Sequence, residues 1–352
     1  MSDFIQKFNQ SRIYQIPARA REIETIDMHT AGEPLRVITA GYPQINAGSL
    51  LEYRRILKDE FDDLRKAIMF EPRGHADMYG CLLLPPFNKE ADCSVIFMHN
   101  EGYSTMCGHA VIGIMTLAVK MGWVEAREGL AKLKIEAPCG LILVQAKVTG
   151  EEVIASFECV PSFVGALDEQ VYLPSLDKEV RYDLAFGGAF YAYVDAAQLN
   201  LSLTEGNYAK IIQLGTEIKN VVVTSSNKII HPQNSELSFL YGTIFISNPL
   251  SESADSRNVC VFADGEVDRS PTGSGVSGRM AIHHARGELD VGEGMVIESL
   301  IGTRFKAKVA RTLTLGEIDA VVPYVEGQAY ICGVNRLILD PADPLNQGFL
   351  LR

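Results

Sequence analysis

Residues 106–113 (MCGHAVIG) place a cysteine, Cys107, where a loop turns into a helix. From Ala110 to Val119 every side chain is uncharged and nearly all are apolar, so we expect this helix to be buried on every face. Those ten residues are too few to cross a bilayer. The free amide groups and the dipole at a buried helix start favour a thiolate or a bound carboxylate. The segment therefore predicts a low-pKa thiol beside an anion site.

A second segment repeats this design. Residues 97–113 (FMHNEGYSTMCGHAVIG) align without gaps with residues 262–278 (FADGEVDRSPTGSGVSG) and share five identities in seventeen positions. Both segments pass from an apolar strand through a polar loop to a helix opened by glycine, and Cys107 aligns with Thr272. We infer two similar halves whose helix starts face each other. One thiol and one hydroxyl would then reach opposite faces of the same carbon atom.

Four chemical interpretations fit these two helix starts. In a cysteine hydrolase, Cys107 needs a histidine base, and His109 is expected to have poor geometry because it lies two residues along the same helix. Residues 272–275 (TGSG) suggest a phosphate-binding loop, although the Lys-Ser/Thr of the Walker pattern is absent. A buried cysteine with a structural role is the third interpretation. The fourth is proton transfer at a carbon next to a carboxylate, for which two helix N-termini supply fixed donors and a cysteine supplies the base.

Two other loops carry titratable residues. Asp27, Glu33 and Arg36 surround a glycine-containing turn, where they form either a structural ion-pair cluster or part of a catalytic site. His75 lies in residues 71–80 (EPRGHADMYG), between an expected helix and an expected strand. It is a functional candidate because loops often carry function, and a solvated loop residue is the alternative.

Composition and charge narrow the class of function. The chain has 352 residues, of which 47% are hydrophobic and 22% charged, as in ordinary globular proteins. Its formal charge of −12 argues against nucleic acid or an anionic membrane as a partner, since both need clustered Lys and Arg. Small-molecule chemistry is therefore expected.

The N-terminus and the cysteines bear on the compartment. The first 25 residues contain no apolar stretch of the kind found in a secretory signal or a membrane anchor, and we expect a polar arm there. Seven cysteines without an export signal indicate reduced thiols in the cytoplasm. Because neither a CxxC motif nor zinc-type spacing occurs, no metal site is expected. We assign the six cysteines other than Cys107 to packing.

Short strands around each of the two buried helices predict an α+β fold of two units. In the first unit we expect a surface helix over 50–70 and strands at 81–84, 94–99 and within 132–160. In the second we expect a helix over 204–219, then strands at 220–224, 239–246 and 258–262. The predicted domains are residues 1–184, which carry Cys107, and residues 185–339, which carry Thr272; the tail 340–352 is expected to return to the first domain. A cleft between the domains is the expected substrate site.

Seven segments together resemble the proline racemase superfamily: DMHTAGEPLRV, EPRGHADMYG, HNEGYSTMCGHAVIG, AFGGAFYA, FLYGTIF, NVCVFADGEVDRSPTGSG and DPLNQGFLLR. They extend over nearly the whole chain beyond the first 20 residues. The resemblance implies two pseudo-symmetric diaminopimelate-epimerase-like α+β domains, each with strands wrapped around a buried central helix. It also implies a site between the domains, no cofactor and, commonly, a homodimer.

The position of Thr272 points to a branch of this superfamily. Its racemases and hydroxyproline epimerases carry a second cysteine there, whereas the Cys-plus-Thr pattern is similar to that of the trans-3-hydroxy-L-proline dehydratases. The resemblance thus implies that Cys107 is the general base and that Thr272 stands in place of the second acid/base. The expected reaction removes the Cα proton and water on one face of the ring, giving an enamine that tautomerises to 1-pyrroline-2-carboxylate. A proline racemase or hydroxyproline 2-epimerase is the alternative, and a non-catalytic imino-acid-binding protein is the second alternative.

The resemblance also implies five substrate-binding positions: Gly108, His109, Asp268, Gly273 and Ser274. The two glycines are expected to donate backbone amides to the substrate carboxylate. Asp268 is expected to accept from the ring ammonium, and capping of the following helix is the alternative role. Ser274 replaces the Thr more usual in the racemase motif and keeps the hydroxyl.

Overall fold

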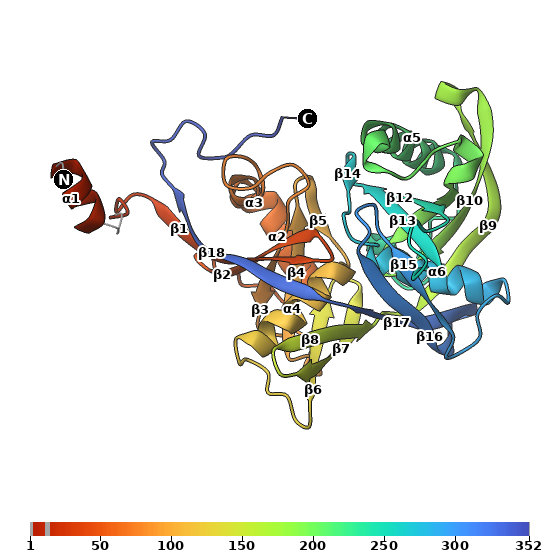
Figure 1. Ribbon diagram of the computed structural model, residues 1–352, viewed down its shortest axis with the longest axis horizontal. Helices are drawn as coiled ribbons and strands as arrows, with labels where there is room; N and C mark the ends of the chain where they lie inside the picture. The colour runs from red at the N-terminus through yellow and green to blue at the C-terminus, as the bar shows by residue number, and fades with distance from the viewer. Residues whose placement is uncertain (1–2, 11–14, 352) are drawn as a thin grey trace.

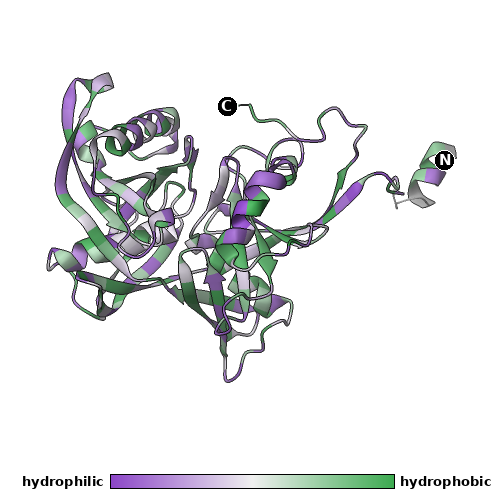
Figure 2. Ribbon diagram, turned by 180° about the vertical axis from the view of Figure 1, so that it is seen from behind, coloured by the Kyte–Doolittle hydropathy of each residue, from purple (hydrophilic) through white to green (hydrophobic). Residues whose placement is uncertain are grey.

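The computed structural model describes residues 3–10 and 15–351 and contains two lobes, which lie side by side in Figure 1. Parts of the predicted N-terminal arm (residues 1, 2 and 11–14) and the last residue of the predicted tail (352) lie outside this description. Along the strands, buried and exposed residues alternate, as in β6 (Leu130–Ala137), and hydrophilic and hydrophobic residues alternate in the same way in Figure 2. In each lobe, one face of the sheet therefore packs against the core.

The first lobe is a curved sheet of eight successive strands with a ninth short strand attached. In spatial order these are β18 (Ala329–Leu339), β1 (Arg21–Thr30), β2 (Glu33–Ala40), β3 (Tyr79–Leu84), β4 (Cys93–His99), β6, β7 (Gly140–Thr149) and β8 (Glu152–Glu158). The short strand β5 (Gly102–Ser104) pairs with β4. The last strand of the chain, β18, thus completes the first sheet.

The second lobe repeats this order. Its strands are β9 (Ser162–Leu173), β10 (Lys178–Phe186), β11 (Phe190–Asp195), β12 (Leu240–Ser247), β13 (Ser256–Phe262), β15 (Gly294–Glu298), β16 (Arg304–Leu315) and β17 (Ile318–Gly327), with β14 (Glu266–Val267) on β13. β17 also pairs with β9, which closes a ring, and with β8 of the first lobe. The parallel pairs occur at equivalent places, β2 with β3 and β4 with β6 in one lobe, β11 with β12 and β13 with β15 in the other. The predicted pseudo-symmetric α+β fold is confirmed.

A buried helix occupies the centre of each lobe. α4 (Gly108–Lys120) and α6 (Gly273–Ala285) both have 13 residues. Every residue of α4 from Gly108 to Ala118 is buried, as is every residue of α6 from Gly273 to Ile282. The predicted burial of the first helix on every face is therefore confirmed.

The outer helices differ from the sequence-based expectation in two places. The stretch expected to be one helix over 50–70 forms two, α2 (Leu50–Glu60) and α3 (Asp62–Met69). Residues 220–224, expected to be a strand, belong to the long helix α5 (Tyr208–Ser225). The helix α1 (Asp3–Gln10) stands apart from both lobes in Figure 1. The described part of the chain also contains four short 3₁₀ helices: η1 (Pro174–Leu176), η2 (Ala196–Leu199), η3 (Glu205–Asn207) and η4 (Ser235–Leu237).

The predicted domain limits stay a prediction. The limit at residues 184/185 falls within β10, and both partner strands of β10, β9 and β11, belong to the second lobe. In the tail, the amide of Phe349 donates to the Glu71 carbonyl at 2.8 Å, and Arg73 donates to the carbonyls of Leu345 and Asn346 at 3.0 and 2.5 Å. The tail thus contacts the loop that follows α3. No helix in the described part of the chain is long and apolar enough to cross a membrane.

Candidate active site

The N-termini of α4 and α6 meet between the lobes. A Cβ atom placed on Gly108 would lie 2.6 Å from Cα of Gly273, and one on Gly273 would lie 2.7 Å from Cα of Gly108. The ring of Phe157 closes the same space, 3.0 Å from the first of these Cβ positions. Glycine is therefore required at both helix starts, because any side chain would push the two backbones apart.

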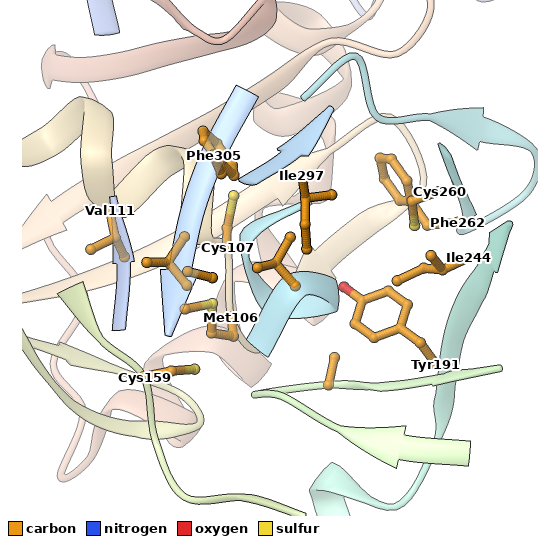
Figure 3. Close-up of a cluster of buried hydrophobic side chains, with 14 of the residues drawn as sticks. Met106, Cys107, Val111, Cys159, Tyr191, Ile244, Cys260, Phe262, Ile297 and Phe305 are labelled. Carbon is orange, nitrogen blue, oxygen red and sulfur yellow. The ribbon is translucent and has the colours of Figure 1, made fainter. Parts of the chain in front are cut away.

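All seven predicted site residues line one small cavity at this junction. Its volume of about 20 Å³ has room for roughly one water molecule. The complete lining is Tyr79, Met106, Cys107, Gly108, His109, Tyr191, Tyr241, Cys260, Phe262, Asp268, Thr272, Gly273 and Ser274. Figure 3 shows part of this junction, with Cys107 and Met106 on one side and Tyr191, Cys260 and Phe262 on the other. The two halves thus contribute to one site.

Cys107 is the N-cap residue of α4 and contacts a histidine. Its backbone is extended (φ −148°, ψ 103°), and its Sγ lies 3.1 Å from Nδ1 of His109. The expectation that His109 would have poor geometry for this contact is wrong. An extended N-cap residue points its side chain back over the helix opening, so a side chain two positions later can reach it.

The neutral form of His109 leaves a proton acceptor facing the thiol. Burial lowers the pKa of His109 to about 3, so the ring is neutral near pH 7. Its Nε2 lies 3.2 Å from the carbonyl oxygen of Pro34, which can only accept, so Nε2 carries the proton. Nδ1 is therefore unprotonated and accepts from the Cys107 thiol.

The thiol of Cys107 is not acidified in this conformation. Burial raises its pKa well above the usual range, against lowering hydrogen bonds from the Ala110 amide and the Tyr79 hydroxyl. The carboxyl groups of Asp268 and Glu33 add to the rise. The predicted low-pKa thiol is therefore wrong for the closed site, because the helix start does not offset complete desolvation.

Thr272 occupies the equivalent position on α6 in a strained conformation. Its φ of 67° and ψ of 93° lie in a region that β-branched residues rarely adopt. Its hydroxyl is buried and makes no hydrogen bond of ordinary geometry, although it lies close enough to lower the pKa of Asp268. Backbone strain and a buried hydroxyl without an ordinary hydrogen bond are both more typical of functional sites than of simple helix caps.

Asp268 lines the cavity, where a binding role would place it, and is not the cap of α6. One carboxylate oxygen accepts from the Ser270 amide at 2.7 Å, which braces the turn before α6, and the residue also lines the cavity. Burial raises the pKa of Asp268 to about 6, with lowering contributions from Ser270 and Thr272. The helix cap itself is Thr272, so Asp268 braces the turn without capping α6.

Sequence reasoning missed the three tyrosines of the cavity. Tyr79 lies at the start of β3, at the end of the segment singled out for His75, and its hydroxyl hydrogen-bonds Oγ of Ser104. The hydroxyl of Tyr191 lies 2.7 Å from Oγ of Ser274, and Tyr241 comes from β12. A tyrosine in a strand is usually a core residue, so only the folded chain distinguishes these three.

Cys260, assigned to packing, also lines the cavity. It is fully buried, and desolvation raises the pKa of its thiol well above the usual range. All seven cysteines are unpaired. Among residues 3–10 and 15–351, no group of three or more His, Cys, Asp or Glu side chains is placed to hold a metal ion.

The remaining candidates lie outside the cavity. Asp27 and Arg36 form a two-point ion pair at 2.9 and 2.7 Å, and Arg36 also donates to the carbonyls of Ile68 and Arg73. This ion pair stabilises the first lobe, which agrees with the interpretation of these residues as a structural ion-pair cluster. The side chain of His75 is exposed, and its Nδ1 lies 2.7 Å from the carbonyl oxygen of the neighbouring Ala76.

Glu33 instead links the two lobes. Its carboxylate accepts from the Arg269 amide at 2.7 Å, and the Arg269 guanidinium lies 3.7 Å from the same oxygen. Asp77 of the first lobe contacts Arg269 at 3.4 Å and accepts from the Tyr208 hydroxyl at 2.9 Å. These contacts join the two lobes beside the cavity. We call the four residues that make them, Glu33, Asp77, Tyr208 and Arg269, the latch.

Comparison with known proteins finds similar sequences over most of the chain. The family model described as proline racemase matches residues 25–350. The chain is 46% identical to the trans-3-hydroxy-L-proline dehydratase of Colwellia psychrerythraea over 331 residues, which cover 94% of this chain and 93% of that protein. It is 45% identical to the enzyme of the same name from Azospirillum brasilense over 333 residues, covering 94% and 99%. It is also 44% identical to a 3-hydroxyproline 2-epimerase of Burkholderia multivorans over 334 residues, covering 95% and 99%.

The fold also matches a solved structure. The crystal structure of a hydroxyproline epimerase from Agrobacterium vitis with bound trans-4-hydroxy-L-proline superposes with a TM-score of 0.87 at 29% sequence identity. The match covers 96% of this chain and 97% of that one.

Proposed function

The chain belongs to the proline racemase family, and we propose that it removes water from trans-3-hydroxy-L-proline, as a hydro-lyase. The observation that carries the proposal is the pair of side chains at the two helix starts. One is a thiol, Cys107, and the other a hydroxyl, Thr272. A thiol can take a Cα proton, whereas an unassisted threonine hydroxyl is far too weak a base to return one from the other face. Net inversion is therefore disfavoured and elimination is favoured.

The substrate carboxylate would bind where the two helix N-termini converge. Gly108 and Gly273 present backbone amides there, and both helix dipoles favour an anion. The same donors stabilise the enolate-like charge that develops when the Cα proton leaves. Asp268, which lines the cavity, would accept from the ring ammonium.

The lobes must separate to admit the substrate. The cavity of about 20 Å³ holds roughly one water molecule, and a five-membered ring with a carboxylate is several times larger. Closure around the bound ring then excludes water from the reactive carbanion.

The base would be activated by His109. Its unprotonated Nδ1 lies 3.1 Å from Sγ and is the acceptor for the thiol proton. Because burial lowers the pKa of His109 to about 3 and raises the pKa of the thiol, this transfer requires the negative charge of the bound substrate carboxylate to stabilise the imidazolium. In trans-3-hydroxy-L-proline the hydroxyl and the Cα hydrogen lie on the same ring face, because both are opposite the carboxylate. A base on the Cys107 side therefore removes the proton from the face that the hydroxyl leaves, and the elimination is syn.

A single assay tests the proposal. The purified protein is incubated separately with trans-3-hydroxy-L-proline, trans-4-hydroxy-L-proline and L-proline, and ketimine formation and optical rotation are followed. We expect ketimine from the first substrate and no inversion of the other two. The second candidate function is epimerisation, favoured by the Burkholderia multivorans relative. Loss of optical rotation without ketimine would establish that function instead.

Replacing the base gives the first prediction. Cys107→Ser should lower dehydration at least about 100-fold, because a serine hydroxyl is a much weaker base of nearly the same volume. Thermal unfolding should stay close to that of the parent protein. Cys332→Ser, which changes an exposed cysteine, is the control and should retain full activity. Substantial turnover by Cys107→Ser would rule out Cys107 as the base.

We also propose that the protein works as a homodimer in the cytoplasm. The exposed apolar side chains of Tyr330, Ile331 and Val334 on β18 support a partner surface, and seven unpaired cysteines support a reducing compartment. Light scattering of the purified protein tests the dimer, and fractionation of the source cells tests the compartment.

A further inference from the structure

The proposed reaction needs an acid as well as a base. Hydroxide is a poor leaving group, so a proton must reach the 3-hydroxyl oxygen as its bond to carbon breaks. In the trans isomer this oxygen is on the Cys107 side of the ring. The acid must therefore come from the first lobe and reach the cavity there.

Tyr79 meets these conditions. It lies on β3 of the first lobe, lines the cavity and is only 3% exposed. Its ring and the His109 ring meet edge to face with centroids 4.8 Å apart, and its hydroxyl lies close enough to the Cys107 thiol to lower the pKa of that thiol. The hydroxyl also hydrogen-bonds Oγ of Ser104, three residues before Cys107. Tyr79, Cys107 and His109 thus form one connected group.

The other two cavity tyrosines come from the second lobe. Tyr191 and Tyr241 come from β11 and β12 of the second lobe, and Tyr191 is engaged by Ser274 on the Thr272 helix. Their rings pack against each other with centroids 5.8 Å apart. Tyr191 is therefore held on the Thr272 side, whereas the Tyr241 hydroxyl also influences the pKa of Tyr79. Tyr79 differs from both in its contacts with His109 and Ser104.

We propose that Tyr79 is the general acid that protonates the departing hydroxide, with Ser104 as the residue that positions its hydroxyl. This inference rests on the proposed dehydration. Because Tyr79 is fully desolvated, its pKa is raised and the phenol stays protonated until hydroxide develops beside it.

The proton count closes over one turnover. The Cys107 proton moves to Nδ1 of His109, and the thiolate takes the Cα proton. The Cα–C3 double bond forms as the C3–O bond breaks, and the Tyr79 proton joins the departing hydroxide to give water. The proton on His109 then returns to the Tyr79 phenolate, which restores a neutral thiol, imidazole and phenol. The product is the enamine, and no other reactant is needed.

The test separates proton removal from loss of the hydroxyl. In D₂O, Tyr79→Phe should lose dehydration of trans-3-hydroxy-L-proline at least about 100-fold, while Cα hydrogen exchange of L-proline stays within about 3-fold of the parent enzyme. Fluoride leaves without a proton, so Tyr79→Phe should still release fluoride from trans-3-fluoro-L-proline at close to the parent rate. Tyr53→Phe is the matched control, since it removes another buried hydroxyl of the first lobe, bonded to the Pro43 carbonyl away from the cavity.

Each outcome decides the inference. Retained dehydration by Tyr79→Phe would overturn it, and so would an equal fall in dehydration, exchange and fluoride release, which would make Tyr79 a positioning residue for Cys107. If Tyr79→Phe does not fold, Ser104→Ala should show the same separation with a smaller loss, and its absence would also overturn the inference. Failure of the proposed function is distinct, because the parent enzyme itself would then release no ketimine.

Discussion

At the scale of single residues, the N-cap residues of the two central helices differ in their side chains, a thiol against a hydroxyl, and in backbone strain. Thr272 adopts a positive φ of 67°, whereas Cys107 has an ordinary extended backbone. Such a conformation in a β-branched residue costs on the order of 1–3 kcal/mol. The fold tolerates this cost because Thr272 is held between the buried Ser270 turn and α6.

A cysteine at position 272 should restore some proton transfer at the second face of the substrate Cα. Thr272→Cys is expected to invert L-proline at a rate at least about 10-fold above that of Thr272→Ser, since a second base then faces the opposite side of Cα. Polarimetry with L-proline measures this. If Thr272→Cys only loses dehydration and never inverts a proline substrate, Thr272 does not stand at the second base position.

The raised pKa of Asp268 predicts that catalytic activity falls at acidic pH. Burial raises this pKa to about 6, so the carboxylate that accepts the ring ammonium is lost as the pH falls below about 6, and kcat/KM should fall with it. His109, with a pKa of about 3, remains neutral over this range and does not contribute. Glu33 and Arg269 face Asp268, and burial raises the pKa of Glu33 as well, which couples the two carboxyl groups. The residual activity of Asp268→Asn should lack this acid limb, and an unchanged limb in the variant would exclude Asp268 as its source.

At the scale of elements, the two central helices could be predicted from the sequence, whereas the end of α5 and the Cys107–His109 contact could not. A run of ten uncharged residues after Met106-Cys107-Gly108 already required a helix buried on every face. The segment NVVVT at 220–224 has strong strand preference, yet it forms the last turns of α5, where Val222 is buried against the sheet. Tertiary packing overrides such local preferences. The contact between Cys107 and His109 depends on the N-cap backbone geometry, and no spacing rule contains it.

The glycine contact between the two helix starts makes a prediction about stability and activity together. Gly273→Ala places a methyl group 2.7 Å from Cα of Gly108 and 3.3 Å from the Phe157 ring. We expect a loss of about 1–3 kcal/mol in the free energy of unfolding, because the added methyl group forces the two helix starts apart. We also expect kcat/KM to fall at least about 100-fold, since the anion donors move apart. Urea denaturation and steady-state kinetics measure the two effects.

Gly206→Ala is the control for this variant, because a Cβ at Gly206 meets nothing within 4 Å. Its stability and activity should match those of the parent protein. A Gly273→Ala enzyme with parental activity would show that the two helix starts need not touch.

At the scale of the whole molecule, the latch that joins the lobes should control access to the site. Tyr208→Phe removes the hydrogen bond to Asp77 of 2.9 Å, which favours the closed form by about 0.5–1.5 kcal/mol. We expect KM to rise about 2- to 10-fold with little change in kcat, because closure contributes to binding. Tyr172→Phe removes a comparable Tyr–Asp hydrogen bond of 2.5 Å on an exposed surface and should leave KM unchanged. If both variants behave alike, the latch does not take part in closure.

The order of strands has a further consequence for synthesis on the ribosome. The strands of the second lobe are contiguous in the sequence, from β9 at residue 162 to β17 at residue 327, so they emerge from the ribosome one after another. The first sheet cannot be completed until β18 has emerged and paired with β1, more than three hundred residues after β1 appeared. The nascent first lobe therefore carries the unpaired backbone groups of β1 through most of translation, and those groups are a template for pairing with other chains. The half that is made first is the half that is finished last.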